Sequence, residues 1–174
     1  MPSYFSTTNY YRAILMELIR STNMWNCALA SAAMVLNKPI KELEELIGHN
    51  GSEIIHPELK SPGNRKGFHQ QEIIDASLVL GFAVTPIEAD PVQTPDGINF
   101  HKIKFFDFNS SEHRFLSHLN NTVGVLSGET QSGYWHNVAW DGKYIFDPRG
   151  KIYKLEDSKI DFKIYWLFTK IKSF

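Results

Sequence analysis

The fold of this chain is decided by residues 134–148, which read YWHNVAWDGKYIFDP. Two runs rich in β-formers flank an Asp-Gly pair, the strongest short-range signal for a β-hairpin. A two-residue Asp-Gly loop makes Trp140 and Lys143 a directly opposed pair. Counting outward in that register places His136 opposite Asp147. Opposed residues share one face of a sheet with Cβ atoms roughly 4.5–5.5 Å apart, so we expect the carboxylate to hydrogen-bond the imidazole. A three-residue loop or a bulge would instead send Asp147 to the other face.

Working outward from this hairpin, the sequence predicts mainly helices before residue 81 and only strands from residue 122 onward. The predicted strands cover 82–87, 101–108, 122–127, 134–140, 143–147, 151–153 and 162–168. The predicted helices cover 9–20, 27–37, 41–47, 69–80 and a segment from Ser110 or Ser111 to Asn120. Two loops rich in Pro and Gly, 51–68 and 92–99, interrupt them. The sequence therefore predicts an α+β fold, with amino-terminal helices packed on a carboxy-terminal antiparallel sheet.

Length and composition exclude several classes of protein. The 174 residues are enough for one domain, which we expect to span 1–174. A formal net charge of −1 gives no field to attract nucleic acid. The longest apolar run, 28–36, is well short of the roughly 20 residues of a membrane span, and the amino terminus lacks the pattern of a signal peptide. The sequence predicts a cytoplasmic protein that binds neither nucleic acid nor membranes.

Cys27 is the only cysteine of the chain, which excludes an intrachain disulfide and a multi-thiolate zinc site. The histidines lack the spacing of zinc ligands, and we expect His49, His56 and His69 to lie on the surface. No metal and no organic cofactor is implied. The oligomeric state is not predicted.

Cys27 opens a predicted helix, where the positive end of the helix dipole favours the thiolate. A nearby imidazolium would lower the thiol pKa further, and attack on an amide needs a proton donor for the leaving nitrogen. We expect His136 to supply that proton and Asp147 to orient His136. The order Cys, His, Asp, with the Cys on an early helix and its partners on adjacent strands, is the layout of papain-like folds.

A second interpretation remains open. A lone cysteine in an alanine-rich helix is often buried filler, and His136 with Asp147 can be a structural cross-strand pair. The chain would then be a papain-like scaffold that only binds a protein partner. The reactivity of the thiol separates the two interpretations.

Two short blocks carry a resemblance to a known superfamily. Residues 25–36, WNCALASAAMVL, resemble the nucleophile helix of the bacteriocin-processing double-glycine peptidases, and YWHNV at 134–138 with FDPRG at 146–150 resembles their His and Asp segments. The order of the elements and GFHQQEII at 67–74 are similar to the josephin deubiquitinases. The resemblance implies a papain-like cysteine peptidase domain that acts on a peptide, an isopeptide or a glutamine side chain.

The oxyanion donor departs from the pattern of that superfamily. Many members carry a Gln about six residues before the Cys, a position that is Ser21 here. We expect Asn23 to present the amide donor instead, together with the backbone N–H of Cys27. Asn26 is the competitor, but its adjacency to Cys27 favours a helix-capping role.

Two tryptophans neighbour the predicted catalytic residues. Trp25 and Trp135 are expected to form a narrow slot for a thin chain, such as a glycine pair or a glutamine side chain, although a core role for both remains an alternative. The loops 51–68 and 92–99 are expected to flank the slot and to contact a folded protein or an extended peptide tail. The predicted partner is therefore a protein or peptide substrate.

Overall fold

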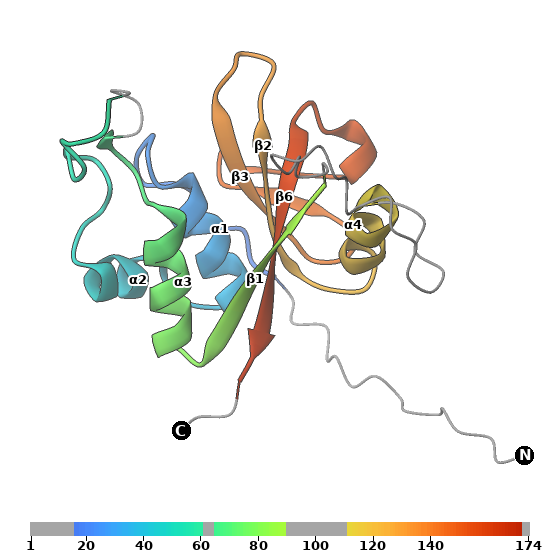
Figure 1. Ribbon diagram of the computed structural model, residues 1–174, viewed down its shortest axis with the longest axis horizontal. Helices are drawn as coiled ribbons and strands as arrows, with labels where there is room; N and C mark the ends of the chain where they lie inside the picture. Colours follow the sequence, from blue (N-terminus) through green and yellow to red (C-terminus); the bar gives the residue numbers. More distant parts are fainter. Residues whose placement is uncertain (1–15, 61–64, 90–110, 172–174) are drawn as a thin grey trace, which may run out of the picture.

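The computed structural model describes residues 16–60, 65–89 and 111–171 (Figure 1). Its described part is an α+β fold in which a six-stranded antiparallel sheet has the order β1-β6-β2-β3-β4-β5. The helices are α1 (Cys27–Leu36), α2 (Ile40–Ile47), α3 (Gln70–Val79) and α4 (Ser111–Leu119), with a short 3-10 turn at Leu155–Asp157. The strands are β1 (Phe82–Glu88), β2 (Gly124–Glu129), β3 (Trp135–Trp140), β4 (Ile145–Asp147), β5 (Lys151–Tyr153) and β6 (Asp161–Lys170).

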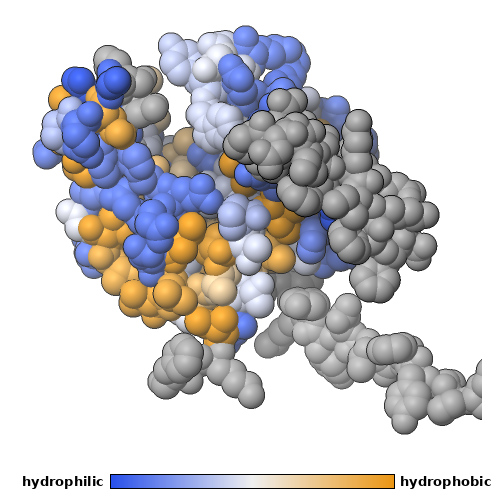
Figure 2. Space-filling view, viewed as in Figure 1, coloured by the Kyte–Doolittle hydropathy of each residue, from blue (hydrophilic) through white to orange (hydrophobic). Residues whose placement is uncertain are grey.

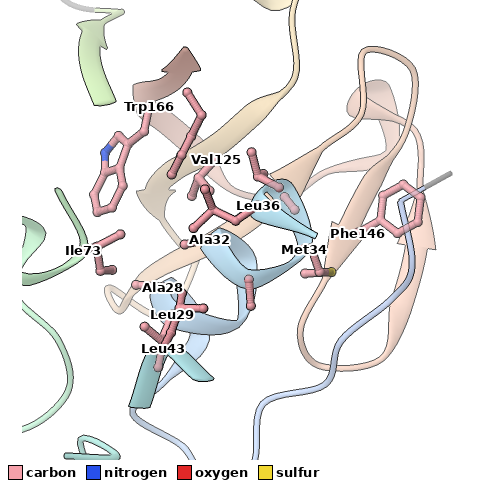
Figure 3. Close-up of a cluster of buried hydrophobic side chains, with 14 residues drawn as sticks. Ala28, Leu29, Ala32, Met34, Leu36, Leu43, Ile73, Val125, Phe146 and Trp166 are labelled. Carbon is pink, nitrogen blue, oxygen red and sulfur yellow. The ribbon is translucent and has the colours of Figure 1, made fainter. Parts of the chain in front are cut away.

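Helix α1 is the central element of the larger core. Its alanine-rich sequence favours a helix, and the helix ends where Asn37 adopts a left-handed conformation with φ 52°. Every residue from Ala28 to Leu36 is buried, because α1 lies between β2 and β3 on one side and α2 and α3 on the other. Figure 3 shows Ala32 and Leu36 of α1 close to Val125 of the sheet, and Ala28 and Leu29 close to Leu43 of α2. A helix buried on all sides holds its first residue, Cys27, at a fixed place beside the sheet.

The opposite face of the sheet carries a second, smaller core. Leu126, Val138, Ile145 and Tyr165 are fully buried there, beneath Phe115 and Leu119 of α4. In Figure 1, α1 to α3 lie on one side of the sheet and α4 on the other. Each central strand therefore alternates between two apolar layers, which fixes its register.

The predicted helix at 9–20 is wrong in its described part. Residues 16–20 contain no helix; the rest of that prediction, the loop 92–99 and the strand 101–108 lie outside the described residues. The apolar side chains of this segment, Met16, Leu18 and Ile19, instead pack against the α1 core. The Ser21 N–H then donates to the Pro148 carbonyl at 2.9 Å. Tertiary contacts have overridden a helical pattern that a short segment could not sustain alone.

The β3–β4 turn lies one residue later than predicted. Trp140 faces Ile145, so the turn is centred on Gly142 and Lys143. The Asp141 carboxylate accepts the Lys143 N–H at 2.8 Å, and Gly142 has φ 95°. Asp141 thus occupies the first position of the turn, where its carboxylate accepts N–H groups of the turn in the way that a backbone carbonyl would.

This turn changes the partner of Asp147 but not its face. The predicted direct opposition of His136 and Asp147 is wrong by two positions, since extending the observed β3–β4 register puts Val138 opposite Asp147. A shift of two keeps each side chain on its face, whereas a shift of one would not. His136 and Asp147 are consequently diagonal neighbours on one face, within reach of each other.

No helix in the described ranges is both long enough and apolar enough to span a bilayer.

Candidate active site

Cys27 is the first residue of α1. Its side chain is partly exposed, whereas the nine residues after it are buried. As the first helical residue, Cys27 has a backbone N–H with no acceptor inside the helix. The helix start therefore presents a thiol and a free donor in the same place, and the helix dipole favours an anion there.

His136 and Asp147 form a buried pair. The His136 Nε2 lies 2.9 Å from Asp147 Oδ1, and the imidazole is 2 % exposed. Asp147 also accepts the Arg149 N–H at 2.8 Å on Oδ1 and the Tyr153 hydroxyl at 3.3 Å on Oδ2. Burial disfavours the charged carboxylate, but the hydrogen bonds from His136 and the Arg149 N–H, together with the His136 charge, hold the pKa of Asp147 below the usual value. An ionised Asp147 can only accept, so His136 donates through Nε2.

The imidazole also interacts with the thiol. Because Nε2 is bound to Asp147, Nδ1 is the nitrogen left for Cys27. Burial opposes charge on His136, yet hydrogen bonds to Asp147 and Cys27 raise the pKa of His136 to about 9. Burial likewise opposes a thiolate, yet the hydrogen bond and the charge of His136 bring the pKa of Cys27 below its usual value. The two shifts together favour a thiolate–imidazolium pair.

Asn137 is a contact of the nucleophile that sequence reasoning missed. Its Nδ2 donates to Cys27 Sγ at 3.8 Å, while its Oδ1 accepts a hydrogen bond from the Ser127 hydroxyl. A signal was available: in the strand sequence WHNVAW, Asn137 is a polar residue two positions before the buried Ala139, on the face toward α1.

The loop before Cys27 is held by its own side chains. Asn23 Oδ1 accepts the Trp25 N–H at 2.7 Å, and Asn23 Nδ2 donates to the Asn50 carbonyl at 2.9 Å. Asn23 thus joins this loop to the segment after α2. One amide hydrogen of Asn23 is engaged in this way, and its oxyanion role stays a prediction.

Asn26 occupies the N-cap of α1, but the expected capping hydrogen bond is absent. Its Nδ2 donates instead to Thr22 Oγ1 at 2.7 Å and to Glu44 Oε1 at 3.3 Å. Asn26 is fully buried, so its side chain points toward α2 and not back over the helix start.

The two tryptophans lie on different segments: Trp25 is in the loop two residues before Cys27, and Trp135 is the first residue of β3, next to His136. Trp135 is 51 % exposed, and its neighbour Tyr134 is exposed too. Trp25 is half-buried, with the Lys66 ammonium 5.6 Å from its ring centroid. Figure 2 shows the surface hollowed between the segment after α2, at the upper left, and the β2–β3 hairpin at the top. The exposure of Trp135 argues against the core role considered for it.

Three histidines expected on the surface gather around Glu72. His49 Nε2 lies 2.8 Å from Glu72 Oε1, and His56 Nε2 lies 3.7 Å from Glu72 Oε2. The rings of His56 and His69 are in edge contact, with centroids 4.0 Å apart. The His49 and His56 side chains are only 15 % and 20 % exposed, so these two are half-buried and not on the surface as predicted, whereas His69 is exposed as predicted. No group of three or more His, Cys, Asp or Glu side chains in 16–60, 65–89 and 111–171 is arranged to hold a metal ion.

Comparison with known proteins adds no family. No protein-family model and no curated protein matches this chain. What the site can do follows from its parts: a partly exposed thiol, a buried imidazole beside it and a carboxylate behind the imidazole. These are the components of covalent acyl transfer.

Proposed function

We propose that this protein is a thiol-dependent hydrolase of amides with a papain-like fold. One arrangement carries the proposal: His136 Nε2 donates to Asp147 at 2.9 Å, the next residue, Asn137, lies 3.8 Å from Cys27 Sγ, and the interaction between His136 and Cys27 shifts the pKa of both groups. Nucleophile, base and orienting carboxylate thus form a continuous chain. The resemblance of residues 25–36 and 134–150 to papain-like peptidases supports the same activity.

In the first half of the reaction, the Cys27 thiolate attacks the carbonyl carbon of the amide. A C–S bond forms and the carbonyl π electrons move to oxygen. The Cys27 N–H and, as we predict, Asn23 donate to this oxyanion. The His136 imidazolium then gives its proton to the nitrogen as the C–N bond breaks. The products are an amine, or ammonia from a glutamine side chain, and a thioester on Cys27.

In the second half, water attacks the thioester carbonyl and His136 accepts its proton. The C–S bond breaks, the acid leaves and the thiolate returns. Asp147 keeps Nδ1 of His136 directed at the sulfur and stabilises the imidazolium in both halves.

The substrate we propose is a protein or peptide. Trp25 lies two residues before Cys27 and the exposed Trp135 lies next to His136, and we propose that the two indoles form a narrow slot for a thin chain. A peptide, an isopeptide and a glutamine side chain all form the same thioester and differ only in what leaves. With its single cysteine the protein suits a reducing compartment, and the cytoplasm is the setting we propose.

Intact-mass spectrometry tests the proposal. The protein is treated with peptide electrophiles and with ubiquitin carrying a carboxy-terminal electrophile, and Cys27→Ser serves as the control. We expect one adduct on Cys27, formed at pH 6 much faster than on a free cysteine analogue. Reactivity equal to that of the analogue, whose pKa is about 8.5, would contradict the proposal and favour a scaffold that only binds a partner.

A further inference from the structure

Beside the thiol lies a second polar pair, Asn137 and Ser127. The two residues face each other across β2 and β3. Asn137 is 7 % exposed and Ser127 is fully buried. The Ser127 hydroxyl donates to Asn137 Oδ1, and Asn137 Nδ2 donates to Cys27 Sγ at 3.8 Å. The Ser127 hydrogen bond therefore decides which end of the amide meets the sulfur.

The apolar surroundings of this pair make it an unfavourable choice if its only role were to fill space in the core. Its neighbours on the same face are Val125 and Ala139, both fully buried in the α1 core. A buried amide without hydrogen-bond partners is unfavourable, and an apolar pair of similar volume would satisfy the packing. The partners that the structure gives the amide are one serine and the sulfur of the proposed nucleophile.

We propose that Asn137 is a catalytic residue that donates a hydrogen bond to the Cys27 thiolate, and that Ser127 is its positioning residue. This inference rests on the proposed function. The Asn137 backbone N–H also interacts with the sulfur and favours the thiolate. A hydrogen bond to an anion is stronger than one to a neutral group, so the contact strengthens when the thiol ionises. It stabilises the sulfur before attack and again when the thiolate leaves the thioester.

The test is the pH profile of Cys27 alkylation by iodoacetamide in Asn137→Leu, which keeps a similar volume but has no donor. We expect alkylation at pH 6 to slow by roughly three- to tenfold. Above pH 9 the variant should react as fast as the wild type or faster, because a more basic thiolate is the better nucleophile. Two profiles that cross in this way indicate a change in the thiol and not a loss of fold.

The sign of the change is decisive. If Asn137 Oδ1 faced the sulfur, the amide would accept from the thiol and Asn137→Leu would react faster at pH 6. That result, or profiles that coincide with the wild type at every pH, overturns the inference while leaving the proposed function in place. A wild-type thiol no more reactive at pH 6 than free cysteine would instead defeat the proposed function.

Ser127→Ala gives a milder test should Asn137→Leu fail to fold. Loss of the serine hydroxyl frees the amide to rotate, so we expect slower alkylation at pH 6, by a smaller factor than in Asn137→Leu. Ser31→Ala is the matched control, since Ser31 is a fully buried serine one turn after Cys27 whose hydroxyl has no hydrogen-bond partner. Equal profiles for the two serine variants would contradict the positioning role of Ser127.

Discussion

Two histidine–carboxylate pairs of nearly equal length lie in this protein. His136 and Asp147 are 2.9 Å apart, and His49 and Glu72 are 2.8 Å apart. Both histidines use Nε2 for the carboxylate. They differ in their other partner: His49 Nδ1 accepts the Gly51 N–H at 3.1 Å, whereas the imidazole of His136 interacts with the Cys27 thiol.

The carboxylates differ in the same way. Glu72 accepts the His69 N–H at 2.7 Å and completes a capping box at the start of α3, so the His49 pair fastens the α2–α3 loop to a helix. Asp147 is held by a backbone N–H and a tyrosine hydroxyl, which leave the imidazole oriented toward Cys27. A histidine–carboxylate pair becomes a candidate base only when a reactive group faces its other nitrogen.

The largest expected effect is the difference between substitutions of the two histidines, because His136 is proposed to act in catalysis and His49 only in stability. We expect His136→Gln to lower kcat/KM by about 10²- to 10⁴-fold, the usual contribution of general acid–base catalysis. His49→Gln should leave kcat within about threefold and lower the Tm, because it removes a partly buried hydrogen bond to a charged group. Steady-state kinetics and thermal unfolding of both variants check this. Equal losses of activity in well-folded variants would mean that the comparison is mistaken.

The pH profile of kcat/KM is the next largest effect. Because the pKa of His136 is raised to about 9, the imidazolium persists below that pH and activity should fall as the pH rises through about 9. Asp147→Asn should move this basic limb to lower pH, since an amide stabilises the imidazolium less well. His49→Gln is the control and should leave the limb where it is. A limb unmoved by Asp147→Asn would show that Asp147 does not act through His136.

The sequence was sufficient for helices α1 to α4 and for the face of the His–Asp pair. The alanines of α1 favour a helix, and the helix ends at Asn37, which adopts a left-handed conformation. Helix α2 likewise ends at Gly48, with φ 95°. In both helices the conformational preferences of the residues agree with the tertiary structure. The hairpin register was wrong, but the error of two positions preserved the face of His136. The predicted hydrogen bond between His136 and Asp147 survived, because a shift of two positions leaves each side chain on the same face of the strand.

The remaining features depend on contacts between distant segments. Residues 16–20 pack against the core without forming the predicted helix, and nothing in the local sequence indicates that these core contacts outweigh the helical pattern. The cluster at Glu72 joins residues from both ends of a long loop to a helix, and Asn137 meets Cys27 across 110 positions of sequence. Spacing rules detect ligands on one helix or hairpin and miss groups assembled by the fold.

A smaller effect is expected for Glu72, whose contribution to the free energy of unfolding should decrease in acid. Burial disfavours its charge, but hydrogen bonds from His49 and the His69 N–H lower its pKa below the usual 4.5. Its contribution to stability is therefore fully present above pH 4.5 and is lost as the pH falls through the lowered pKa. We expect Glu72→Gln to reduce the free energy of unfolding by roughly 1–3 kcal/mol at pH 7 and by less at pH 3, as measured by urea denaturation. A difference that is the same at both pH values would contradict this origin.

The smallest expected effect is that of the Tyr153 hydroxyl. It donates to Asp147 Oδ2 at 3.3 Å, on the opposite oxygen from His136. Burial first, and then the Asp147 charge, raise the pKa of Tyr153 to about 12, so the hydroxyl remains a donor throughout the neutral pH range. Tyr153→Phe removes one weak, long hydrogen bond from the carboxylate, which makes Asp147 slightly more basic without breaking its bond to His136. We expect kcat/KM to change by about two- to threefold or less, since such a bond is worth roughly 0.5–1 kcal/mol.

Tyr165→Phe is the matched control: its hydroxyl is paired with Thr122 Oγ1 at 2.8 Å, in the core beneath α4, and its loss should lower the Tm and leave the pH profile unchanged. A large loss of activity in Tyr153→Phe alone would place the tyrosine hydroxyl among the groups that hold the His136–Asp147 pair in its reactive geometry.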